Sequence, residues 1–145
     1  MKGRALLLSI KPRFADAIFA KTKRVELRRV KPKVGPGDLV LVYVSAPRSR
    51  LEGAFEVERV FAEPPSKLWP DVEKQAGVTK AEFDAYFSGR ETAYGIVIRR
   101  VWALRPVSLA TMRKVQIRPP QSYQYLEAIE TARLVANGSR RTAEQ

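Results

Sequence analysis

The stretch AIFAKTKRVELRR, residues 17–29, passes from one hydrophobic period to another within a few positions. On its N-terminal side, Phe14 and Ile18 are apolar and recur at helical spacing, and Pro12 before them suits the first turn of a helix. The residues that follow alternate, with Val25 and Leu27 apolar, as in a strand that buries one face. We therefore expect a helix over residues 12–21, a short turn, and a strand over residues 24–28.

The charged residues of this stretch surround a single carboxylate, Glu26. Glu26 and Arg28 stand two apart, so a strand would place them on one face, opposite the core residues. Lys23 precedes the strand and can bend over that face. One interpretation is a polar cleft that holds a small anionic or polar ligand. The other is a salt-bridge cluster on a solvated face, which would add little to stability.

The rest of the chain supplies further strands and helices. Continuous apolar runs at 5–10 and 39–46 indicate buried strands, and residues 51–63 alternate around Gly53, a possible bulge. A helix is expected after residue 65, and Thr79 with Glu82 predicts a capping box ahead of another. A strand at 92–104, a short helix at 106–114 and a final helix at 123–136 complete the order. This order predicts an α+β fold, a small curved β-barrel with a mixed, mainly antiparallel sheet and flanking helices.

Length and composition restrict the function. A chain of 145 residues favours one domain, which we place at residues 1–136, followed by a flexible tail at 137–145. Cysteine and histidine are absent, so we expect no metal site and no cofactor. We find no signal peptide and no stretch of transmembrane length, which predicts a cytoplasmic protein without a membrane partner.

The charge is strongly and unevenly positive. The chain has 27 Lys and Arg against 15 Asp and Glu, a formal net charge of +12, and residues 1–50 alone hold 13 basic and 3 acidic groups. A one-sided basic surface predicts a polyanionic partner, RNA or DNA. The alternative is that the charge only keeps the protein soluble.

Three segments together resemble the ASCH domains of the PUA-like superfamily. They read LLLSIKPRFADAIFAKTKRVELRR, PGDLVLVYVSAP and GAFEVERV, and AEFDAYFSGR and PPQSYQYL extend the likeness almost end to end. The family pattern reads approximately Ile-x-x-Gly-x-Lys-x-x-Glu-x-Arg. Lys23, Glu26 and Arg28 fill its last three places, and Lys21 stands where glycine is usual.

The resemblance implies a PUA-like barrel with a cleft beside this motif and a role in binding RNA or modified nucleosides. One branch of the family hydrolyses N4-acetylcytidine with a lysine, a threonine and a glutamate. Lys23 matches that lysine, but Glu26 stands at the place of the threonine and Ala76 near that of the glutamate. Ribonuclease activity is also proposed in the superfamily.

Further candidate residues for ligand binding lie at strand ends and before the last helix. Ser9 and Lys11 stand at the end of the first strand, just before Pro12. Tyr43 could stack on a base or belong to the core. Gln121 can read a base edge, although the same segment also fits a helix start with Ser122 as its cap. The complete set is Ser9, Lys11, Lys23, Glu26, Arg28, Tyr43, Ser45, Arg48, Gln121, Ser122 and Tyr123.

Three functions remain open. The first is a nucleic-acid-binding module, for RNA before DNA, with a cleft for one base or modified nucleoside. The second is a small hydrolase that acts on an acylated cytidine or on RNA, with Lys23 and Glu26 as the candidate catalytic groups. The third is a protein-interaction adaptor, which the uneven charge disfavours.

Overall fold

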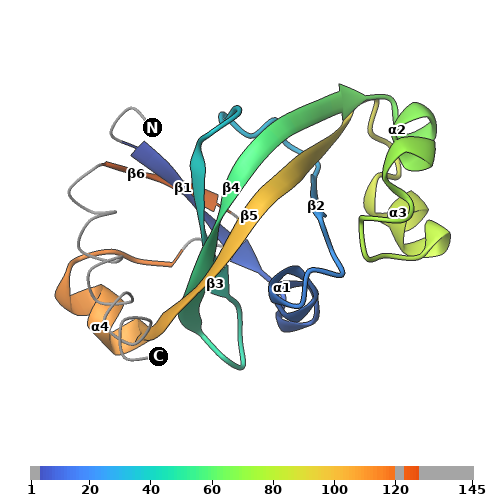
Figure 1. The fold of residues 1–145 in the computed structure, drawn as a ribbon. Coiled ribbons are helices and arrows are strands. Elements are labelled where there is room, and N and C mark those ends of the chain that lie inside the picture. The colour runs from blue at the N-terminus through green and yellow to red at the C-terminus, as the bar shows by residue number, and fades with distance from the viewer. Residues whose placement is uncertain (1–3, 120–122, 128–145) are drawn as a thin grey trace.

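The computed structural model describes residues 4–119 and 123–127, in which helices are interspersed among the strands of one sheet (Figure 1). In order, the elements are β1 Arg4–Ile10, α1 Pro12–Phe19, β2 Val25–Arg28, β3 Leu39–Val44, β4 Arg50–Glu63, α2 Pro65–Val72, α3 Lys80–Tyr86, β5 Ala93–Ser108, α4 Leu109–Lys114 and β6 Tyr123–Glu127.

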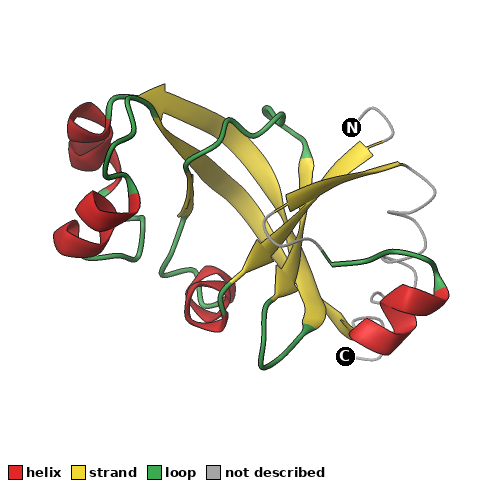
Figure 2. Ribbon diagram, turned by 180° about the vertical axis from the view of Figure 1, so that it is seen from behind, coloured by secondary structure: helices red, strands yellow, loops and turns green. Residues whose placement is uncertain are grey.

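The strands form one six-stranded sheet in the order β2-β5-β4-β3-β1-β6. Among the described residues, the β1–β3 pairing is the one parallel pairing, and the other four are antiparallel. The long strands β4 and β5 run side by side and curl across the molecule, with α2 and α3 beyond one end and α4 beyond the other (Figures 1 and 2). This confirms the predicted α+β fold, with the sheet an open, curled half-barrel.

Strands β1 and β3 lie in the centre of the protein and are buried on both faces. Leu6 of β1 and Val42 of β3 belong to a cluster that packs under Ile18 of α1. Leu7 of β1 and Leu41 of β3 face the opposite cluster, which includes residues of α4. Burial on both faces is the reason that these two strands read as continuous apolar runs rather than as alternating sequences.

Gly53 marks the irregularity that the sequence predicts in β4. The register with β5 shifts between Leu51 and Gly53, and the register with β3 shifts at the same place. A Cβ atom at Gly53 would lie 2.3 Å from the backbone oxygen of Trp102 and 2.4 Å from the ring of Phe19. Only glycine lets α1 approach the sheet this closely.

The predicted final helix is wrong where the structure describes it. Residues 123–127 form β6, which pairs antiparallel with β1 from Arg4 opposite Glu127 to Leu8 opposite Tyr123. Without β6, the backbone N–H and C=O groups along one side of β1 would lack strand partners, so pairing overrides local helical preference. Residues 128–136 and the predicted tail at 137–145 lie outside the described residues, so the domain boundary stays a prediction.

The predicted capping box and the predicted absence of a membrane span both concern the helices. The side chain of Thr79 accepts a hydrogen bond from the backbone N–H of Glu82 at 3.1 Å, and the carboxylate of Glu82 accepts one from the N–H of Thr79 at 2.9 Å, which confirms the capping box. Within residues 4–119 and 123–127, no helix has the length and apolar character needed to cross a membrane.

Candidate functional site

A cleft of about 560 Å³ opens between the end of β1, the start of α1, strand β2 and helix α3. It brings together side chains that lie far apart in the sequence. The predicted site residues along its wall are Ser9, Lys11, Lys23, Glu26, Arg28 and Ser45.

Lys23 lies in the turn between α1 and β2, with only 2% of its surface exposed. Its Nζ donates a hydrogen bond to the backbone oxygen of Ala76 and stands 3.7 Å from Oε1 of Glu26 and 5.0 Å from the ring centre of Phe14. Burial lowers the pKa of Lys23, and the nearby Glu26 carboxylate opposes that shift. A lysine that loses its proton more readily than usual can exchange protons with a ligand.

Backbone contacts hold this turn in place. Lys21 has a φ of 65°, in the left-handed region that favours glycine, which matches the glycine usual at this place in the family pattern. The N–H of Lys23 donates to the oxygen of Ala17 at 3.0 Å. Gly77, with a φ of 68°, lies against the stem of Lys23, where a Cβ atom would come within 3.1 Å. The lysine is therefore enclosed before any ligand binds.

Glu26 is buried, which contradicts the interpretation of the charged residues as a salt-bridge cluster on a solvated face. Its exposure is 5% because β2 is covered on both sides. Val25 and Leu27 pack with α2 and α3, as predicted, while the other face of β2 lines the cleft. Alternation identified which residues share a face, but it could not show that both faces are covered.

The Glu26 carboxylate lies between two cations. Nη1 of Arg28 stands 3.0 Å from its Oε2, and the Arg28 side chain is 13% exposed. Lys23 approaches the other oxygen. These three groups form one buried, charged unit, which is also open to the cleft. They can offer a ligand two positive charges and one acceptor.

Helix α3 supplies cleft residues that the sequence did not single out. Glu82 lies at the cleft and pairs with Arg13 of α1 through two contacts at 2.5 and 3.0 Å. Tyr86 donates a hydrogen bond to the backbone oxygen of Leu27 at 3.3 Å, and the guanidinium of Arg29 lies 4.7 Å from its ring centre. Tyr86 is half-buried and lines the cleft as well.

We expect the pKa of Glu82 to be near 2. The hydrogen bond from Arg13 lowers the pKa to about 2 from its usual 4.5, with help from the backbone N–H of Thr79. The contribution of this pair to stability is thus complete above pH 4.5 and is lost as the pH falls through about 2. Carbon-13 NMR of the side-chain carboxyl would measure the titration. Arg13→Ala should raise the pKa, and an unchanged midpoint would contradict the assignment of cause.

The remaining predicted residues lie elsewhere. Tyr43 is buried in the cluster with Leu7 and Leu41, away from the cleft, as its core interpretation predicts. Gln121 and Ser122 lie outside the described residues. The backbone of Tyr123 belongs to β6, so the segment does not begin a helix there.

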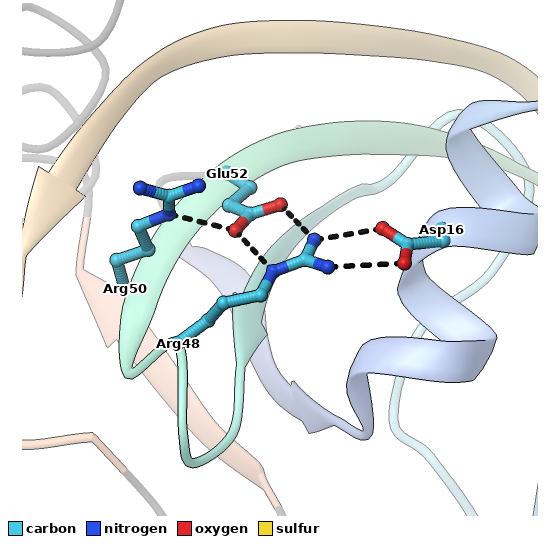
Figure 3. A network of polar contacts seen from close by, with 4 residues as sticks. All are labelled: Asp16, Arg48, Arg50 and Glu52. Carbon is cyan, nitrogen blue, oxygen red and sulfur yellow. Dashed lines mark hydrogen bonds and ion pairs between the residues drawn. The ribbon is translucent and has the colours of Figure 1, made fainter.

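Arg48 acts as a structural link rather than a cleft residue. It pairs with Asp16 of α1 at 2.8 Å and with Glu52 of β4, which also binds Arg50 (Figure 3). Glu52 and Asp16 together raise the pKa of Arg48. The network ties the β3–β4 loop to the helix that carries one wall of the cleft.

The comparisons with known proteins agree with this fold. The model of the ASCH domain family matches residues 8–104. An ASCH domain-containing ribonuclease of Zymomonas mobilis subsp. mobilis is 28% identical over 132 residues, which cover 90% of this chain and 89% of the relative. The crystal structure of ASCH from Zymomonas mobilis superposes with a TM-score of 0.87 and 28% identity, covering 93% of this chain and 96% of that one.

A longer relative is also similar. The large ribosomal subunit protein uL22 of Ureaplasma parvum serovar 3 is 27% identical over 123 residues, and the match spans 84% of this chain but only 39% of that protein. The family model covers more than half of the chain, and the resemblance noted in its sequence is confirmed. The chain belongs to the ASCH domain family.

Proposed function

We propose that this ASCH domain binds RNA and holds one nucleotide of it in the cleft. The observation that carries the proposal is the convergence of Lys23, Glu26 and Arg28 on a cleft of about 560 Å³. That volume suits a single nucleoside rather than a nucleic-acid duplex. The relative from Zymomonas mobilis that carries the name ribonuclease supports RNA as the partner.

The chemistry of the cleft fits a nucleotide. The Glu26 carboxylate can accept a hydrogen bond from an exocyclic base amine, as carboxylates do with N4 of cytosine. Arg28 can bind phosphate or a base carbonyl, and the exposed Lys11 at the rim can bind phosphate. Tyr86 and Phe14, both partly exposed at the cleft, offer ring surface against a base.

RNA cleavage is the second candidate function. The buried Lys23 ammonium, whose pKa is lowered, lies beside a carboxylate, and the two can exchange a proton with a 2′-hydroxyl or a leaving group. The name of the relative favours this reaction. Hydrolysis of an acylated cytidine is less well supported, because Ala76, a buried residue whose backbone oxygen accepts a hydrogen bond from Lys23, stands near the place where that branch of the family has a glutamate.

One assay separates binding from turnover. A single-stranded RNA labelled at its end and incubated with excess protein should be bound in every case, and electrophoresis under denaturing conditions shows whether it is also cut. Parallel incubation with N4-acetylcytidine, followed by chromatography, tests the amide reaction. If RNA is neither bound nor cut at low salt, the proposed function is wrong and the adaptor interpretation gains support.

Selectivity is the property that should depend most on the cleft. Glu26→Gln keeps the shape but loses the acceptor charge, so we expect discrimination among nucleotides to be lost, while Arg29→Ala only weakens binding generally. Lys67→Ala removes an exposed cation on α2 and is the control. Fluorescence anisotropy with RNAs that differ in one base measures the affinity for each base and therefore the selectivity. Unchanged selectivity in a folded Glu26→Gln variant would contradict the role of the cleft.

RNA affinity should weaken steeply with salt. If the basic surface of residues 1–50 neutralises about five phosphates, log Kd should change against log salt with a slope of magnitude roughly 3.5 for a single strand, because about 0.7 counterion is released per phosphate. Anisotropy titrations between low and physiological salt measure the slope. A slope near zero would exclude binding through phosphates.

A further inference from the structure

A second hollow, of about 330 Å³, lies between the end of α1 with its following turn and the middle of β5. We call it the β5 groove and define it by Lys21, Arg24, Arg99, Arg100 and Trp102. Lys23 lines both this groove and the cleft, so the two hollows lie next to each other on either side of that residue. None of the five defining residues lines the cleft.

The β5 groove is strongly basic. Arg99 and Arg100 share one carboxylate, that of Glu56, each at 3.2 Å. Lys21 and Arg24 are exposed, and neither takes part in an ion pair among the described residues. The groove therefore has four cationic side chains and one paired carboxylate, and this excess of positive charge attracts an anionic chain.

An exposed indole ring stands at the same groove. Trp102 keeps 40% of its surface exposed, and within residues 4–119 and 123–127 only Val30 is another large hydrophobic residue of this exposure. A single exposed aromatic residue is ordinary on a protein surface. An aromatic ring among unneutralised cations is the combination that binds single-stranded nucleic acid, because bases stack on the ring while the cations hold the phosphates.

The groove residues stand on fixed backbone. The N–H of Arg24 donates to the oxygen of Gln75 at 2.7 Å, and the N–H of Ile98 donates to the oxygen of Arg24 at 2.9 Å. Trp102 lies in β5 opposite Ala54 of β4. The backbone positions that carry these side chains are therefore set before binding, so binding orders only the side chains and not the chain segment itself.

We infer that single-stranded RNA runs from the cleft past Lys23 into the β5 groove, where Lys21 and Arg24 hold its phosphates and Trp102 stacks on a base. This inference rests on the proposed RNA binding and adds a second subsite to it. It also predicts the form of the RNA, because the bases of a duplex are already stacked and paired and cannot lie on Trp102.

Length-dependent affinity tests the subsite. We compare a single nucleotide, the shorter RNA, which fills the cleft alone, with RNAs of about ten nucleotides, within the range of single-strand sites. Trp102→Ala should weaken binding of the longer RNA about tenfold and leave the shorter RNA unchanged, since one stacked base is lost. Trp102→Phe should keep most of the affinity, and Arg24→Ala should weaken the longer RNA more than the control Lys67→Ala does.

Fluorescence provides an independent measurement. The chain has two tryptophans, so Trp69→Phe leaves Trp102 as the only indole. In that variant, the longer single strand should quench the emission, and a duplex of the same length should not. Circular dichroism confirms that each variant is folded, as expected for Trp102 because its ring is exposed.

The outcomes separate the two claims. If Trp102→Ala binds the longer RNA as the wild type does, or if saturating RNA leaves the emission unchanged, the groove subsite is wrong, while selectivity that depends on Glu26 would leave the proposed function standing. If RNA of neither length binds the wild type, both are overturned.

Discussion

Glu26→Ala is expected to lower the free energy of unfolding by roughly 3–5 kcal/mol, because it leaves a buried cation without its partner. Lys23 is 2% exposed and has its Nζ 3.7 Å from the Glu26 carboxylate, so solvent cannot replace the lost charge. Urea unfolding followed by circular dichroism measures the change. Asp84→Ala is the matched control, because its ion pair with Lys80 is exposed and should contribute only about 0.3–0.5 kcal/mol.

A double replacement separates stability from ligand binding. Lys23→Met combined with Glu26→Leu replaces both charges by apolar groups of similar size, and such replacements of buried pairs are often neutral or stabilising. We expect the double variant to recover the part of the lost stability that comes from the unpaired Lys23, while Arg28 still lacks the Glu26 carboxylate, and to discriminate poorly among nucleotides. A loss below about 1 kcal/mol for Glu26→Ala alone would show that the site is more hydrated than its burial indicates.

Gly53→Ala is expected to cost about 3 kcal/mol, at the upper end of what overpacking costs. The new methyl group would stand 2.3 Å from the backbone oxygen of Trp102 and 2.4 Å from the ring of Phe19. The ring can move, but the strand oxygen is held by the pairing of β4 with β5. The strands or helix α1 must therefore separate, and thermal unfolding would show a lower midpoint.

Gly35→Ala is the control for this substitution. A Cβ atom there would have no atom within 4 Å. The unfolded chain loses freedom when glycine is replaced, so this variant should be neutral or more stable by about 0.4–1 kcal/mol. If both variants lost the same stability, the close approach at Gly53 could not be the cause.

Gly53 and Glu26 support the same cleft in different ways. Gly53 lets α1 lie close to the sheet, and the turn after α1 carries Lys23 into the cleft. A variant that lifts α1 from β4 should therefore weaken RNA binding even though Gly53 lines neither hollow. Glu26 acts directly in the cleft, so its variants should change selectivity as well as stability.

Local patterns in the sequence determined most of the elements of this fold. The apolar runs that became β1 and β3, the helical spacing of Phe14 and Ile18, and the box of Thr79 and Glu82 each depend on residues a few positions apart. The motif of Lys23, Glu26 and Arg28 also indicated a polar site beside the helix–turn–strand segment. These features can be predicted from sequence because the interactions that cause them are local.

The tertiary structure alone decided the features that depend on distant partners. Glu26 is buried because the cleft walls come from the end of β1 and from α3, which lie 71 residues apart along the chain when counted from Lys11 to Glu82. Residues 123–127 are a strand because β1 offers them backbone hydrogen bonds. Trp102 and Arg24 become neighbours in one groove only when β5 pairs with β2. Burial and pairing are properties of the assembled sheet, so no window of sequence contains them.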